Sequence, residues 1–223
     1  MFRRDYIVRM IEDMTQMVAK VLNLKQERKT TEALWEIDEL LNRHFRLNSR
    51  LLNSLSVEDI IEMFRMGGMM EVDKLQGVAR MLQEEAGVYK EKNEQYEAVT
   101  RLMKALHLYL YSDLHGADRK LLQLTDLIDE VLSEVSIYQL PVKTERLLLP
   151  YLESIGRYGK AEDCLYRLID QGEDVAVLGE ELYRRLLLKD PEELALGNLP
   201  LLEVKEGQAE WFQVAARAAQ WRA

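Results

Sequence analysis

A chain of 223 residues with 48% hydrophobic and 31% charged residues is long enough to bury a core and too apolar to be disordered throughout. With only 4 Pro and 11 Gly it lacks the frequent turns of a β-sandwich or barrel, so the composition favours helices. The formal net charge is −9, and because residues 1–50 hold 10 Lys and Arg against 8 Asp and Glu, the rest of the chain carries −11. Such an acidic chain would repel phosphate, so we expect no nucleic-acid partner.

The single cysteine and the N-terminal segment indicate the compartment. One Cys excludes an internal disulfide framework and fits a reducing environment. Arg3 and Arg4 precede apolar residues as in a signal peptide, but acidic residues interrupt that stretch and no small-residue cleavage site follows. No run approaches the roughly 18 apolar residues of a membrane span. We therefore expect a cytoplasmic protein that does not enter a membrane.

The first predicted helix carries an apolar seam with spacings of three and four residues. The seam is too short for a stable coiled coil, which favours a helix buried in its own chain. A homodimer through this N-terminal helix is the alternative. With a second helix over residues 30–45 it would form an N-terminal helical bundle, which we place at residues 1–68. The seam residues are Ile7, Met10, Met14, Met17, Val21 and Leu24.

The sequence RMGGMM at residues 65–70 should end a helix, because a glycine here can adopt the left-handed conformation of helix ends. Four of the 10 methionines gather at this point: Met63, Met66, Met69 and Met70. Their thioethers could bind copper, or they could form an adaptable apolar surface for a partner. Because no Cys or His lies nearby to complete a metal site, we favour a third interpretation. In it, the first two methionines pack inward and the last two cover the turn.

Residues 71–92 and 94–115 form the clearest pair of predicted helices, each with an apolar stripe. Asn93 between them is, after Gly, the residue type that best tolerates a left-handed conformation, so the chain should turn there. Three further helices are expected before Gly172, the last two separated by a turn at Gly156, and a C-terminal group of helices after it. The last apolar stripe is made by Trp211, Val214, Ala215, Ala218 and Trp221.

Residues 82–106 and 145–168 repeat one pattern: a helix, a turn, a Tyr, a small Ala and, four positions later, a large apolar residue. A small residue where two helices cross lets them approach closely, while Tyr and Leu fill the space beside it. The pattern resembles the tetratricopeptide family of helix–turn–helix repeats. The matching positions are Leu82, Ala86, Tyr89, Ala98, Leu102 and Ala105, and then Leu149, Leu152, Gly156, Tyr158, Ala161, Leu165 and Leu168.

The resemblance implies an all-α fold of antiparallel helical hairpins, stacked as a degenerate tetratricopeptide-like superhelix. It is degenerate because Ala98 and Ala161 lie 63 residues apart, whereas two tandem repeats span about 68, and because Pro150 falls inside a predicted first helix. We place the repeat region at residues 69–172 and a C-terminal helical cap at 173–223, although all parts could form one compact domain. The whole chain is also similar to an uncharacterised bacterial family of helical proteins, which implies no function.

Side chains that could support catalysis do not converge in the sequence. His44, His107 and His115 lack metal-ligand spacing, and neither a metal-binding motif nor a Gly-rich phosphate loop is present. Cys164 has no neighbouring His, and Asp163 beside it would oppose a thiolate. We therefore interpret Cys164 as a small, partly buried side chain of a repeat helix, and expect no catalytic residue, cofactor or metal site.

The tetratricopeptide resemblance implies that the first helix of each repeat lines a concave groove. Members of that family use basic groove side chains to hold the carboxylates of extended peptides. The favoured function is therefore a non-enzymatic adaptor that binds a protein or peptide segment. A regulatory protein switched by a peptide or small molecule, in which residues 1–68 move against the repeats, is the alternative, and an enzyme is least favoured. The predicted partner-binding residues are Arg80, Gln83, Lys90, Lys143 and Arg146.

Overall fold

The computed structural model describes residues 2–220 of the chain, with side chains for residues 5–211 and for Gln213. Of the predicted last apolar stripe, Val214, Ala215, Ala218 and Trp221 lie outside the described side chains. The described residues form twelve helices and one hairpin of two short strands, which confirms the predicted all-α class. They divide into two compact units, residues 1–140 and residues 141–223.

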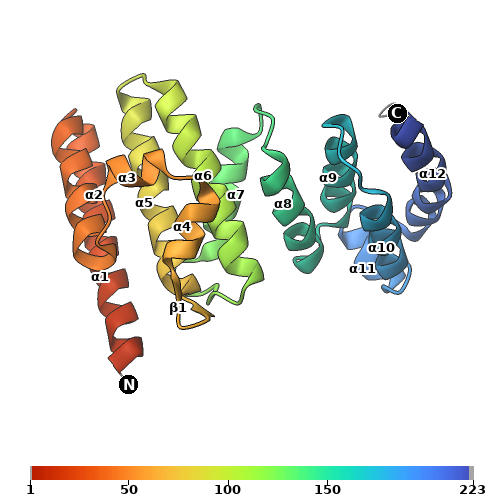
Figure 1. Cartoon of the computed structure of the whole chain (residues 1–223), viewed down its shortest axis with the longest axis horizontal. Helices are drawn as coiled ribbons and strands as arrows, with labels where there is room; N and C mark the ends of the chain where they lie inside the picture. The colour runs from red at the N-terminus through yellow and green to blue at the C-terminus, as the bar shows by residue number, and fades with distance from the viewer. Residues whose placement is uncertain (1, 221–223) are drawn as a thin grey trace. The chain divides into compact units, whose positions relative to one another are not determined.

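The helices and strands of the two units are drawn in Figure 1. Unit 1 contains α1 (Phe2–Gln26), α2 (Thr30–Phe45), α3 (Ser49–Ser54), α4 (Val57–Met63), the strands β1 (Arg65–Met66) and β2 (Met69–Met70), α5 (Val72–Glu91), α6 (Gln95–Leu114) and α7 (Leu124–Val135). Unit 2 contains α8 (Val142–Ser154), α9 (Tyr158–Asp170), α10 (Ala176–Leu186), α11 (Pro191–Leu196) and α12 (Leu201–Gln220).

The boundary after Leu140 differs from the predicted boundaries after residues 68 and 172. In unit 1, α1 and α2 pack against α5, so the predicted N-terminal bundle shares its core with the first predicted repeat. In unit 2, Arg185 of α10 donates to Glu153 of α8 with an Nε–Oε1 distance of 2.7 Å. The rings of Tyr166 of α9 and Trp211 of α12 also meet edge to face. The C-terminal helices therefore belong to the same unit as the second predicted repeat.

The two predicted helical hairpins are present as the packed pairs α5–α6 and α8–α9. The chain turns at Asn93 with φ +60° and at Gly156 with φ +74°, as expected of residue types that tolerate the left-handed region. Ala98 and Ala161 are fully buried, and their small side chains let the paired helices approach closely. α8 continues through Pro150, because burial of the neighbouring apolar side chains outweighs the one backbone hydrogen bond that proline cannot donate.

The apolar seam of α1 is buried inside unit 1. Met10, Met14 and Val21 are at most 1% exposed, and α1 packs against both α2 and α5. This confirms the interpretation of α1 as a bundle helix of its own chain. Among the described side chains of α1, Val8 and Leu22 are the large apolar ones that remain exposed.

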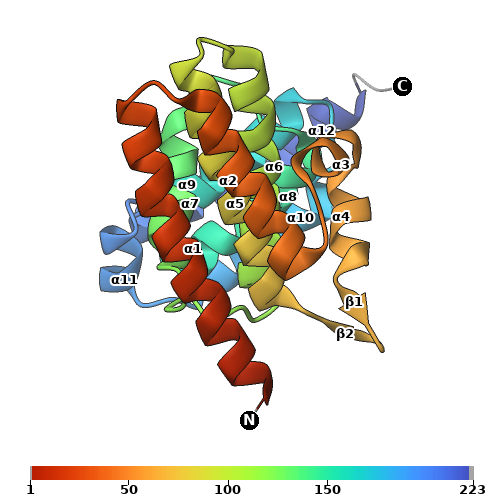
Figure 2. The same ribbon diagram turned by 90° about the vertical axis from the view of Figure 1, so that its left-hand side faces the viewer.

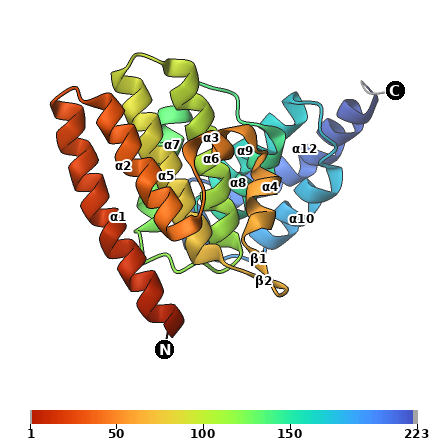
Figure 3. The ribbon, with the colours of Figure 1, turned by 60° about the vertical axis from the view of Figure 1, so that its left-hand side comes forward.

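The segment RMGGMM forms a β-hairpin rather than the end of a helix. α4 ends at Met63, and β1 pairs antiparallel with β2. Gly67 and Gly68 close the turn with φ values of +57° and +81°. Two consecutive positive φ values are typical of a type I′ turn, whose twist matches that of paired strands. Figures 2 and 3 show the hairpin projecting at the end of unit 1 where α1 begins.

The predicted inward packing of Met63 and Met66 is wrong. Ile60, Ile61 and Phe64 occupy the buried positions here, and they share one face of the last turn of α4. Met63 therefore falls on the other face, and the strands carry the next methionines away from the helices. Met63, Met66 and Met69 are 47%, 62% and 64% exposed.

Candidate functional site

The predicted binding residues Gln83 and Lys90 already have partners inside unit 1. Gln83 donates from Nε2 to Glu130 of α7 at 3.1 Å, and accepts from the hydroxyl of Tyr109 at 2.8 Å. Lys90 forms an ion pair with Glu134 of α7. These acidic side chains lie 47 and 44 residues further along the chain, so only the packing of the folded unit reveals the pairs. The polar and charged groups on this part of α5 are therefore largely paired with α7 of the same unit.

Arg80, the third predicted residue on α5, lies between an ion pair and a cavity. Its Nη2 is 2.5 Å from Oε1 of Glu84, one turn along the helix. It also lines a cavity of about 480 Å³ formed by α1, α5 and the start of α7. In this cavity Arg80 and Lys120 are matched by Asp126 and Glu130, so the lining has no excess charge. Such a balanced lining provides little attraction for a charged ligand.

Lys143 and Arg146 lie on the exposed side of α8 in unit 2. Arg146 donates from Nη2 to Oε2 of Glu173 at 2.6 Å. The five predicted residues thus fall into two sets, three on α5 of unit 1 and two on α8 of unit 2. Their role in binding a partner stays a prediction.

Cys164 is a structural side chain of α9 in a small buried cluster. Its thiol donates to Oε2 of Glu145 at 2.7 Å, and Arg167 donates from Nε to Oε1 of the same carboxylate at 2.8 Å. Burial raises the pKa of the Cys164 thiol, and the adjacent Glu145 raises it further. Because the thiolate is the nucleophilic form, this environment opposes reactivity. The cluster ties α8 to α9.

Alkylation should be slow at Cys164 in the native chain. We expect iodoacetamide to react at least about tenfold more slowly with the folded protein than with the protein in denaturant, because the thiol is buried and protonated. Cys164 is the only cysteine, so mass spectrometry of the intact chain reports this thiol alone. Equal rates in the two states would show that the cluster does not protect it.

The three histidines lie in separate environments. His44 Nε2 is 2.9 Å from Oδ2 of Asp13, and His115 stacks on Tyr111 with ring centroids 3.8 Å apart. His107 is buried in α6. Among the described residues, no three His, Cys, Asp or Glu side chains are grouped as a metal ion would require. None of the helices, within the same residues, has the length and apolar character needed to span a bilayer.

A second cavity of about 480 Å³ lies beside the β1–β2 hairpin, and we call it the hairpin cavity. It is bounded by the start of α1, the end of α2, the end of α4 with β1, and the start of α5. Its volume falls within the roughly 300–1,000 Å³ of ligand pockets. Its aromatic and apolar lining consists of Tyr6, Phe45, Leu47, Met63, Phe64 and Met66.

Hydrogen bonds hold the walls of the hairpin cavity in place. The Tyr6 hydroxyl donates to the carbonyl of His44 at 2.6 Å, which joins α1 to the end of α2. Burial raises the pKa of this hydroxyl, so it remains a donor. The backbone N–H of Glu71 donates to the carbonyl of Phe64 at 3.0 Å, which closes the base of the hairpin. The rings of Phe64 and Phe45 meet edge to face behind it. The cavity is therefore pre-formed.

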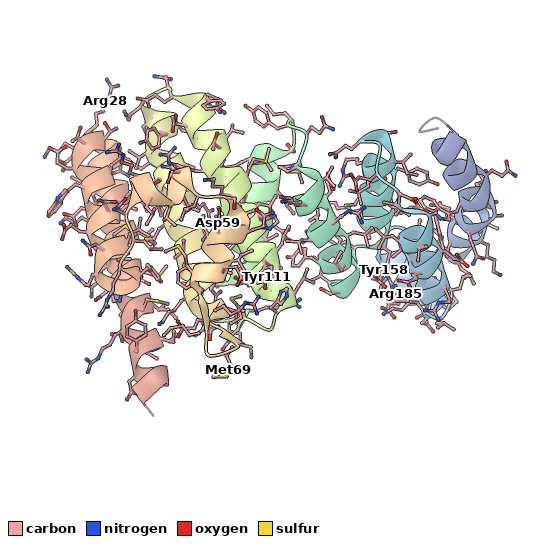
Figure 4. The ribbon with its side chains drawn as sticks, in the orientation of Figure 1. Arg28, Asp59, Met69, Tyr111, Tyr158 and Arg185 are labelled. Carbon is pink, nitrogen blue, oxygen red and sulfur yellow. The ribbon has the colours of Figure 1, made fainter. Side chains whose placement is uncertain are left out.

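Two methionines line the hairpin cavity and a third lies beside them on the hairpin; we call Met63, Met66 and Met69 together the methionine rim. Met66 and Met69 are cross-strand partners, and directly opposed residues project on the same face of a hairpin. Met63 and Met66 line the cavity, and Met69 lies at the far end of the hairpin (Figure 4). Sequence reasoning raises an apolar methionine surface for a partner only as a disfavoured alternative, and it predicts neither the hairpin nor the cavity. The signal that could have found the hairpin is Gly-Gly between Arg65-Met66 and Met69-Met70, since Gly-Gly between two short strands is typical of a two-residue hairpin turn.

The model of a family described as "Family of unknown function (DUF6483)" matches residues 1–213. No curated protein and no solved structure matches the chain.

Proposed function

The chain belongs to DUF6483, a family of unknown function, and from that premise we propose that it is a non-enzymatic scaffold that binds a segment of another protein at the hairpin cavity. The observation that carries the proposal is the exposed methionine rim: Met63 and Met66 line a pre-formed concave cavity, and Met69 is the cross-strand partner of Met66. Exposed apolar groups that gather around a cavity are typical of interaction sites, whereas scattered ones are not. Methionine suits such a surface because its flexible, polarisable side chain adapts to different apolar partners.

As part of the same proposal, α5–α6 and α8–α9 are hairpins of a degenerate tetratricopeptide-like superhelix. The buried Ala98 and Ala161 and the left-handed turns before them support this relation. A scaffold of this kind presents binding surfaces from rigid helices. We expect it to act in the bacterial cytoplasm, with protein rather than nucleic acid as its partner.

The test is a selection of binding peptides with two matched variants of the full chain. Met66→Thr/Met69→Thr removes the two rim methionines on the hairpin strands while keeping the charge and a residue type that favours strands. Ile137→Thr/Leu188→Thr is the control, because these side chains are 82% and 83% exposed and lie outside the cavity. Peptides selected on the wild-type chain should bind the control equally, and the rim variant at least about tenfold more weakly.

The same experiment can refute the proposal. Wild-type and variant chains are first compared by circular dichroism, so that a loss of binding is not caused by unfolding. Selected peptides that bind the rim variant as tightly as the wild type would show that the hairpin cavity is not the binding site.

A further inference from the structure

The hairpin cavity is basic although the chain is acidic. Its lining contains Arg43, Arg46 and Lys74 against one carboxylate, Glu71. The chain as a whole has a formal net charge of −9. A local excess of positive charge in a concave site raises the local concentration of anionic ligands and repels cationic ones. The charge of the cavity is thus opposite to that of its surroundings.

Two of the three cations have no carboxylate of a described residue within hydrogen-bond length. Lys74 is paired with Glu71 at 2.9 Å. Arg43 has its nearest carboxylate, Asp13, at 3.9 Å, beyond hydrogen-bond length, and its side chain is 64% exposed. Arg46 forms neither an ion pair nor a side-chain hydrogen bond with any described residue. Lys90 on α5, by contrast, is paired with Glu134 of its own unit. Arg43 and Arg46 are therefore the cations available to a ligand.

The backbone places Arg43 and Arg46 beside the hairpin cavity. Arg43 belongs to the last turn of α2, and Arg46 is the C-terminal cap of that helix with φ +56° and ψ +34°. The backbone N–H of Arg46 donates to the carbonyl of Asn42 at 3.0 Å. Positive charge is favoured at a helix C-terminus, so the helix stabilises the cations there. The position of these two residues is set by the end of α2 and not by a partner charge.

We propose that the segment bound at the hairpin cavity is an acidic peptide, in which an apolar side chain enters the cavity and flanking Asp or Glu carboxylates pair with Arg43 and Arg46. This inference rests on the proposed function and names its partner. A guanidinium group binds a carboxylate through two parallel hydrogen bonds, which makes Arg well suited to reading such flanks. The methionine rim contacts the apolar anchor, and the cavity volume fits a short segment rather than a folded domain.

A peptide suits this surface better than an anionic membrane does. The cations line a concave cavity, whereas membrane-binding surfaces present their basic residues on an exposed helix face. An anionic bilayer would also face a large area of a chain whose net charge is −9, whereas a short acidic peptide meets only the basic lining of the cavity. A second copy of the same acidic chain is disfavoured for the same reason.

The test uses three pools of short fluorescent peptides with matched lengths. The first has a central Leu flanked by Asp and Glu, the second has the same Leu flanked by Asn and Gln, and the third has the acidic flanks with Ala in place of Leu. Binding to the full chain is measured by fluorescence anisotropy at two salt concentrations. The acidic Leu pool should bind at least about tenfold more tightly than either other pool. Higher salt should reduce the difference between the acidic Leu pool and the amide pool, because it screens the charges.

Charge variants test whether Arg43 and Arg46 cause the preference for acidic flanks. Arg43→Gln/Arg46→Gln should abolish the preference for acidic over amide flanks while retaining the preference for Leu. Arg28→Gln/Arg50→Gln is the control, because it removes the same charge outside the cavity lining. Arg28 lies at the opposite end of unit 1 from Met69 (Figure 4). The control should keep both preferences.

The possible failures are distinguishable. If the amide pool binds as tightly as the acidic pool and Met66→Thr/Met69→Thr abolishes both, the inference is overturned and the proposed function stands. If no pool shows binding that depends on the methionines, both the inference and the proposed function are refuted. Methionine-dependent binding to phosphatidylserine vesicles without peptide binding, or methionine-dependent dimers in analytical ultracentrifugation, would overturn the inference in favour of a membrane or a second copy.

Discussion

Replacing Arg101 with Met is expected to destabilise unit 1 by about 3–5 kcal/mol, because the substitution leaves a buried carboxylate without its cation. Arg101 of α6 donates from Nε to Oε2 of Glu85 of α5 at 2.8 Å, and the two residues are 2% and 0% exposed. Arg101 also donates to Glu97, and its guanidinium lies 3.9 Å from the ring centre of Tyr89. The pair therefore joins the two helices at the centre of the unit.

The loss of stability caused by Arg101→Met should depend on pH. Burial raises the pKa of Glu85, and removing Arg101 would raise it further, because the guanidinium favours the charged carboxylate. A carboxyl group whose pKa is raised by folding contributes stability below its unfolded pKa of about 4.3, and this contribution is lost as the pH rises through its folded pKa. The deficit of Arg101→Met relative to the wild type should therefore shrink as the pH is lowered from about 7 toward about 5.

Hydrogen exchange of the amides of α5 and α6 measures this effect in unit 1 alone. The control is the double variant Glu85→Gln/Arg101→Met, which removes both charges and should recover a large part of the loss at neutral pH. An Arg101→Met chain with wild-type protection at neutral pH would show that the buried pair does not stabilise the unit.

Replacing Trp211 with Ala is expected to destabilise unit 2 by about 3–5 kcal/mol, since it empties the largest site of that core. Trp211 is 1% exposed and donates from Nε1 to the carbonyl of Ala176 at 3.0 Å. Its ring lies directly against Gly179 of α10: a Cβ at that position would be 2.2 Å from Cε2 of the indole. Gly179→Ala should therefore also destabilise unit 2, because the clash outweighs a gain in helix propensity of about 1 kcal/mol.

The contact between Gly179 and Trp211 can be tested by a double-mutant cycle. In a Trp211→Leu background the smaller side chain makes room for a methyl group, so Gly179→Ala should cost at least about 1 kcal/mol less than it does in the wild type. Chemical denaturation followed by hydrogen exchange in α10 measures each variant. Strictly additive losses would show that the indole does not restrict residue 179.

Long periodic elements were the predictable part of the fold. The pairs α5–α6 and α8–α9 follow from apolar stripes of many residues and from Asn93 and Gly156, which are among the few residue types that can end a helix in the left-handed region. The burial of the α1 seam follows in the same way. The boundary after Leu140 was not predictable, because it depends on which helices share a core.

The candidate site was the part that sequence reasoning missed. Strands of two residues carry no periodicity, so RMGGMM is compatible with both a helix end and a hairpin. Met63 and Phe64 are adjacent and both apolar, and only the tertiary packing of α4 decides which of them is buried. The partners of Gln83 and Lys90 are equally non-local. Conversely, Arg43 and Arg46 were not singled out, because nothing local shows that the folded chain leaves them without a close carboxylate.

The most direct test of binding at the hairpin cavity is the spectrum of ¹³C-labelled methionine methyl groups of the full chain during titration with a selected peptide. The chain has 10 methionines, and the threonine substitutions at positions 66 and 69 assign the two rim signals. Binding at the hairpin cavity predicts that the signals of Met66 and Met69 shift in proportion to occupancy, while that of Met81, fully buried in α5, stays in place. Saturating peptide that leaves Met66 and Met69 unshifted would contradict it.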